Sequence, residues 1–214
     1  MSAASRFLTG ALAALLMAIA VFMATAPDAP RRSPPEARET TIVADSGDAI
    51  RRVTIRGFLS MDAPENWSDV PVPVLRGNVG IGVGALSESD DRFLLSVSDS
   101  PDPLGMTGLI SVVHLGSNQP DPVAALDRLA TRLQPDPDAA EQIRPVEATR
   151  TASIQGAVTA YRRRLPGRIS MRMAEITYRV LNIGKHAHLV TSVVVSGSDA
   201  SAPVARAVES IGPG

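Results

Sequence analysis

The feature that most restricts how this chain can fold is an uncharged apolar run near its start. From Phe7 to Ala26 the sequence reads FLTGALAALLMAIAVFMATA, without an Asp, Glu, Lys or Arg. A helix of about 20 apolar residues is long enough to span the hydrocarbon core of a bilayer. A helix buried in a small domain is seldom apolar on every side. The run is therefore predicted to stand apart from the folded domain.

The same run has the parts of an export signal peptide. Arg6 precedes it, and Ala24-Thr25-Ala26 forms an A-x-A cleavage site at its end. Pro27 follows that site directly, and proline there should hinder cleavage. Residues 1–26 are predicted to be either a cleaved signal peptide or an N-terminal membrane anchor. In both cases the rest of the chain is expected to be exported across the cytoplasmic membrane.

Residues 27–49 are predicted to be a linker, because they are rich in proline and charge. Proline holds the chain extended and charge keeps it solvated. The folded domain is expected to cover residues 50–214. A hydrophobic content of 44% for the whole chain is enough for a core.

Apolar residues in that domain alternate in the way that predicts strands and, twice, helices. Asp121 is expected to cap the first helix, with Pro122 at its first position. Ser201 or Asp199 is expected to cap the second. The predicted strands cover residues 52–60, 79–85, 93–97, 109–115, 157–165, 168–183 and 188–196, and the predicted helices cover residues 121–133 and 202–211.

The last three predicted strands form an antiparallel meander with turns at Pro166-Gly167 and Gly184-Lys185. Ile169, Met171 and Met173 have one parity in the middle strand, whereas Ile176, Tyr178 and Val180 have the other. A β-bulge near Ala174-Glu175 would reconcile them. Strands grouped in hairpins with few helices predict an α+β fold, in which an antiparallel sheet of six or seven strands carries packed helices.

This arrangement resembles the LpqN/LpqT family of actinobacterial envelope proteins. The resemblance rests on Pro64-Glu65-Asn66-Trp67 after a first strand, Asp121-Pro122 at a helix start, Ser153-Ile154-Gln155-Gly156 before the meander, and an alanine-rich helix near 202–211. It covers about residues 50–212 and implies the PsbP-like α/β/α sandwich and a non-enzymatic envelope role around lipid or glycolipid export. Lipoprotein members carry a lipobox cysteine, which this chain lacks, so it resembles the non-lipidated members.

The sequence contains no convincing catalytic or metal-binding pattern. The chain has no cysteine, which excludes a thiolate zinc site and a cysteine nucleophile. His186 and His188 could share a strand face, but a surface turn is the preferred interpretation, and His114 is interpreted as structural. No G-x-S-x-G occurs. No catalytic residue, metal or cofactor is therefore predicted.

Two features could serve binding. Arg162 and Arg164 share one face of a strand, and Arg168 and Arg172 follow across the turn, so these four arginines could meet lipid headgroups or an acidic partner. They would equally fit a solvated sheet face. Trp67, the only tryptophan, could line a pocket or plug one end of the core. Nucleic acid is not an expected partner, because no aromatic residues interleave with the arginines.

The sequence thus predicts a non-enzymatic exported module that binds an envelope lipid, a glycolipid or a membrane protein. Two alternatives stay open at this point. One is an envelope serine hydrolase that uses one of the three histidines. The other is a structural subunit of a secretion system, held in the membrane by residues 1–26.

Overall fold

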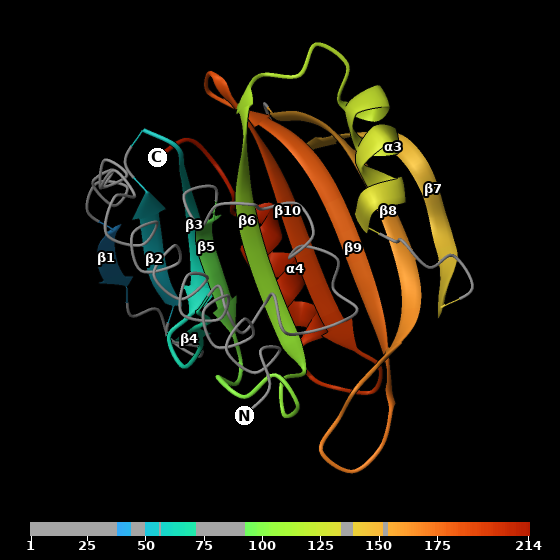
Figure 1. Cartoon of the computed structure of the whole chain (residues 1–214). Helices are drawn as coiled ribbons and strands as arrows, with labels where there is room; N and C mark the ends of the chain where they lie inside the picture. Colours follow the sequence, from blue (N-terminus) through green and yellow to red (C-terminus); the bar gives the residue numbers. More distant parts are fainter. Residues whose placement is uncertain (1–37, 44–49, 56, 72–92, 134–138, 152–153) are drawn as a thin grey trace, which may run out of the picture. The chain divides into compact units, whose positions relative to one another are not determined.

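The computed structural model describes residues 38–43, 50–55, 57–71, 93–133, 139–151 and 154–214 (Figure 1). All of them belong to the compact unit Pro35–Gly214. Within the described part, no helix is both long and apolar enough to cross a membrane. The predicted membrane segment, residues 1–26, lies outside it. The described elements are β1 (Arg38–Val43), β2 (Ile50–Ile55), β3 (Leu59–Pro64), β4 (Ser68–Asp69), β5 (Phe93–Ser98), β6 (Gly108–Ser117), α3 (Pro122–Leu133), β7 (Ala140–Thr151), β8 (Ile154–Leu165), β9 (Arg172–Ile183), β10 (His186–Val195) and α4 (Ser201–Glu209).

The strands form two antiparallel sheets. The larger one has seven strands in the order β4-β5-β6-β10-β9-β8-β7, and the smaller has three in the order β1-β2-β3. The predicted meander is confirmed as β8, β9 and β10, which pair in succession. The chain end returns to the small sheet, where Ser60 and Gly212 exchange two backbone hydrogen bonds of 2.8 and 3.0 Å.

The large sheet has a core cluster on each of its faces. Because neighbouring side chains of a strand point to opposite faces, Leu109 and Val113 of β6 enter one core cluster and Ile110 and Val112 enter another. The first cluster lies under α3, which contacts β7, β8 and β9. The second lies under α4, which contacts β6 and β10, and it also includes apolar side chains of β2 and β3. The two helices therefore cover opposite faces of the sheet (Figure 1). The predicted α+β fold, an antiparallel sheet of six or seven strands with helices packed on it, is confirmed.

The two helices begin differently. Asp121 caps α3 as predicted, because its carboxylate accepts a hydrogen bond of 3.0 Å from the N–H of Ala124. The predicted cap of α4 is wrong: Ala200 occupies the cap position and no side chain bonds there. The apolar stripe of α4 is as expected, with Val204 and Ala207 buried.

Several element boundaries differ from the sequence prediction. Strand β1 lies inside the segment predicted as a linker, where Thr and β-branched residues favour a strand once β2 supplies a partner. The predicted strand 52–60 is instead the β2–β3 hairpin, with Gly57 at φ +80° in its turn. Strand β7 was not predicted, because Pro145 and two register irregularities remove the simple alternation. The predicted strand 79–85 lies outside the described residues.

The predicted β-bulge in β9 is wrong. Residues 172–183 pair with β8 and with β10 without a register shift. Ala174, Ile176, Tyr178 and Val180 keep one parity and lie in the core under α3. The apolar residues of the other parity, from Ile169 to Met173, are simply not core residues. Their positions lead to the candidate site.

Candidate functional site

The β8–β9 hairpin ends in a loop, residues 166–171, that extends past the sheet at its lower end in Figure 1. This loop and its flank carry apolar side chains that point to solvent. Ile169 is 99% exposed, Met171 57% and Met173 38%. Leu104, in the β5–β6 connection, is 44% exposed. These four side chains, which we call the apolar tip, are all the exposed large apolar residues of the described part.

The β5–β6 connection, residues 99–107, lies against the hairpin loop. Asp102 accepts hydrogen bonds from the Arg168 guanidinium, with an Nε–O distance of 2.8 Å and an Nη2–O distance of 2.6 Å. This bond, then the N–H of Leu104, holds the pKa of the Asp102 carboxyl below its usual value. Asp99 closes the same connection by accepting the backbone N–H groups of Thr107 and Gly108 at 2.9 and 3.1 Å. Leu104 is thereby kept at the same end of the sheet as the hairpin loop.

Arg172 joins these two segments from inside. Its Nη1 donates to the Met106 carbonyl at 2.6 Å, and its Nη2 donates to the carbonyls of Pro166 and Pro103 at 3.3 and 3.5 Å. A guanidinium that satisfies three carbonyls is a structural clamp between the loops. It is not available to a lipid or a partner in this arrangement.

The four predicted arginines therefore do not form one patch. Arg162 and Arg164 share a face of β8, as expected, and both are exposed. Arg162 has a weak contact of 3.5 Å with Glu141, and none of the described ion pairs involves Arg164. Arg168 lies in the loop and Arg172 is the clamp. Arg162 and Arg164 line a surface pocket of about 570 Å³ together with Met171 and Met173.

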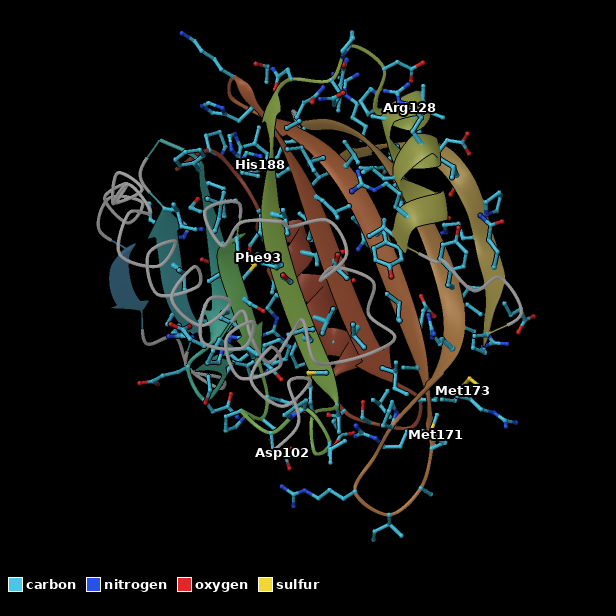
Figure 2. All side chains as sticks on the ribbon, viewed as in Figure 1. Phe93, Asp102, Arg128, Met171, Met173 and His188 are labelled. Atoms are coloured by element: carbon cyan, nitrogen blue, oxygen red, sulfur yellow. The ribbon has the colours of Figure 1, made fainter. Side chains whose placement is uncertain are left out.

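Figure 2 shows the resulting arrangement: Met171, Met173 and Asp102 lie at one end of the large sheet, and His188 lies at the other. Sequence reasoning found the arginines but missed the apolar tip. The signal was present in the change of parity within 168–183, which was interpreted as a bulge. An apolar residue out of phase with the core can instead be one that stays exposed.

Trp67 has both of the roles that the sequence left open. It is 5% exposed and belongs to the core cluster under α4, so it closes that end of the core. It also lines a pocket of about 470 Å³ with residues of β3 and α4, among them Ala63, Pro203 and Arg206. This pocket is separate from the apolar tip.

The three histidines of the chain come together around Phe58. Their ring centroids are 5.1 to 6.4 Å apart, and His114 Nε2 lies 3.3 Å from His186 Nδ1. The interpretation of His188 as a surface-turn residue is wrong, because it is fully buried in β10. Neither of its ring nitrogens has a hydrogen-bond partner among the described residues. In the same part of the chain, no group of three or more His, Cys, Asp or Glu could hold a metal ion.

Comparisons with known proteins give little further information. No model of a known protein family matches the chain, and no curated protein matches it. One similar solved structure is a protein from Bacteroides thetaiotaomicron, at 12% identity and a TM-score of 0.43; the alignment covers 74% of this chain but only 46% of that one. Another is the Ran-binding protein Mog1p of Saccharomyces cerevisiae, at 12% identity and a TM-score of 0.42, with 82% of this chain and 95% of that one covered.

Proposed function

We propose that this protein is an exported, non-enzymatic binding module that docks on anionic membrane lipids through the tip of the β8–β9 hairpin. The observation that carries the proposal is the gathering of Ile169, Met171, Met173 and Leu104 at one end of the sheet, beside Arg162, Arg164 and Arg168. Exposed apolar side chains grouped in this way are typical of an interaction site. Export itself rests on the apolar run at residues 7–26.

The combination of apolar side chains and arginines at the apolar tip suits the interfacial region of a bilayer better than a protein–protein interface from which water is excluded. Apolar side chains can enter the headgroup region while arginines beside them meet lipid phosphates. Full burial of one side chain such as Ile169 stabilises by about 1.5–3 kcal/mol, and each arginine near an anionic surface adds about 1 kcal/mol. Both contributions together give a reversible attachment.

The hairpin loop is also preorganised for docking. Arg172 and the Arg168–Asp102 pair fix the hairpin loop to the β5–β6 connection before any lipid is present. Less conformational freedom is then lost on binding, and less of the binding free energy is spent on ordering.

An enzymatic role has weaker support. A general base must lie within hydrogen-bond reach of the group from which it takes a proton. His188 is buried and unpartnered, and burial, with the neighbouring His114 and His186, lowers the pKa of its imidazole to about 4. A buried ring of such low basicity is a poor candidate for that task.

Flotation with lipid vesicles tests the proposal. We expect more protein to float with phosphatidylcholine vesicles that contain about one third phosphatidylglycerol than with phosphatidylcholine alone, because the arginines need lipid charge. The double variant Ile169→Ser, Met171→Ser should lose most of this binding, and Arg162→Gln, Arg164→Gln should weaken it. A matched control removes the same charge from α3, where Arg128 and Arg132 are exposed, and should bind like the wild type.

Absence of flotation, or equal flotation of the hairpin and α3 variants, would contradict lipid docking. If the hairpin variants instead abolish crosslinking to one membrane protein while vesicles do not bind the wild type, the apolar tip recognises a protein.

A further inference from the structure

A second surface lies away from the apolar tip, between α4 and the sheet. Because α4 contacts β3, β6 and β10 and has at most weak contacts with β8 and β9, it covers the same face of β8 and β9 incompletely. A groove of about 500 Å³ runs along this boundary. That volume is within the usual range for small-molecule sites.

The groove contains Arg179, near the middle of β9. Its side chain is half-buried, and its Nη1 donates to the hydroxyl oxygen of Ser192 at 3.2 Å. None of the described ion pairs includes Arg179. Burial lowers the pKa of this guanidinium, and the nearby positive charge of Arg144 lowers it further. A half-buried charge with one neutral partner is costly, and an anion bound there would offset the cost.

The groove also contains two acidic residues, Glu175 and Glu209, whose negative charges oppose the lowering of the Arg179 pKa. Glu175 is exposed and stands opposite Arg162 in the β8–β9 register. Glu209 is exposed and lies three residues after Arg206 on α4, a spacing at which helical side chains meet. Neither carboxylate forms a described ion pair with Arg179, and both lie at exposed positions, where water screens their attraction for it.

Serine and threonine side chains make up much of the rest of the lining, and valines form its aliphatic part. Val158 of β8, Val194 of β10 and Val204 and Val208 of α4 line it. A ligand that reached Arg179 would place whatever is attached to its anionic group against these valines.

We propose that this groove binds a small amphiphile with a phosphate or carboxylate group, which Arg179 and Arg144 hold while an aliphatic part lies along Val158, Val194 and Val204. The site is separate from the apolar tip and does not depend on membrane docking.

Calorimetric titration of the purified protein tests this inference with three probes: monomeric dihexanoyl phosphatidic acid, octanoate and inorganic phosphate. The first two distinguish a phosphate from a carboxylate headgroup, and we expect at least one to bind about tenfold more tightly than inorganic phosphate. Arg179→Met should weaken that binding about tenfold or more. Arg144→Met, at a half-exposed position where folding is not at risk, should weaken it about threefold.

The matched control is Arg128→Met on α3, at the opposite face of the sheet, which should bind like the wild type. The hairpin variant Ile169→Ser, Met171→Ser should also bind the amphiphile normally, so failure of either proposal leaves the other standing. Three outcomes would overturn the inference. The first is that neither amphiphile binds, and the second is that inorganic phosphate binds as tightly as they do. The third is that Arg179→Met and Arg144→Met are folded and bind with unchanged affinity.

Discussion

His188 has an unfavourable environment in the core of the described part of the chain. Its imidazole is fully buried, its two nitrogens have no described partner, and two other histidine rings lie within 6.4 Å. Burying an unpaired polar group costs about 1–3 kcal/mol. The ring therefore has to stay neutral, and this requirement makes the stability of the fold depend on pH.

We expect the free energy of unfolding to fall as the pH falls from about 6.5 to 4. In the unfolded chain His188 titrates near 6.5, and in the folded chain its pKa is about 4. Between these values the unfolded state binds a proton that the folded state does not, so acid favours unfolding. The loss approaches about 3 kcal/mol at the lower limit. Urea denaturation at a series of pH values measures it.

Carboxylates also titrate in this range, so the informative quantity is the difference between variants. His188→Leu should remove most of the loss, while His186→Gln, a change at the partly exposed neighbour, should retain it. Parallel pH profiles for wild type and His188→Leu would show that the buried imidazole is not responsible. The sequence did not reveal this burial, because the predicted strand begins at His188, beside the turn, whereas β10 begins at His186 and includes His188 in its interior.

Among the elements, the β8–β9 hairpin shows both the strength and the limit of sequence reasoning. The meander was predictable, since Val, Ile and Tyr alternate between clear turns. The exposed apolar end of the hairpin was not predictable. Alternation is used to identify the buried face of a strand, and every apolar residue is then assigned to that face. The sequence also could not predict that Arg172 joins the two loops, because its acceptors are the backbone carbonyls of Met106 and Pro103, more than 60 residues away.

Arg172→Met should loosen the end of the sheet without unfolding the whole domain. The change removes hydrogen bonds to three carbonyls, and we expect a loss of about 2–3 kcal/mol in the free energy of unfolding. Limited proteolysis should then cut within residues 99–107 faster than in the wild type. The matched variant Arg164→Met, at an exposed position of the same hairpin, should change stability by less than about 0.5 kcal/mol. Equal protease resistance in both would rule out the clamp.

Sequence reasoning missed three of the described strands, β1, β4 and β7, and all three lie at sheet edges. Each pairs on one side only among the described strands. Edge strands commonly carry charge and proline, which prevent pairing with other chains. Pro145, Arg144 and Glu147 have this character in β7, and the same residues make the segment look like a loop. The charge and proline that protect an edge strand therefore also interrupt the apolar alternation by which strands are predicted.

At the scale of the whole molecule, the proposed surfaces use different parts of one sheet. The hairpin extends past its end, and the groove opens on the face that α4 covers incompletely. The core under α3 supports both from behind, since Ala174, Ile176 and Tyr178 of β9 are fixed there. Strand β9 can thus place Met173 at the tip and Arg179 in the groove, about 20 Å apart along the strand at about 3.3 Å per residue.

The charge of the whole molecule predicts how membrane docking should respond to salt. The formal net charge of the chain is −1, so no long-range attraction to an anionic surface is expected, and only the arginines beside the apolar tip act at close range. Their contribution is screened as the Debye length falls from about 10 Å at 0.1 M to about 3 Å at 1 M salt.

Flotation of the wild type should therefore weaken several-fold with added NaCl. The variant Arg162→Gln, Arg164→Gln, which binds more weakly at low salt, should change little. The two should converge at high salt, where apolar contacts alone remain. In the variant Ile169→Ser, Met171→Ser, the remaining binding should still be sensitive to salt, but the apolar contribution, which salt does not remove, should be lost. Parallel salt curves for wild type and arginine variant would mean that these arginines do not face the lipid.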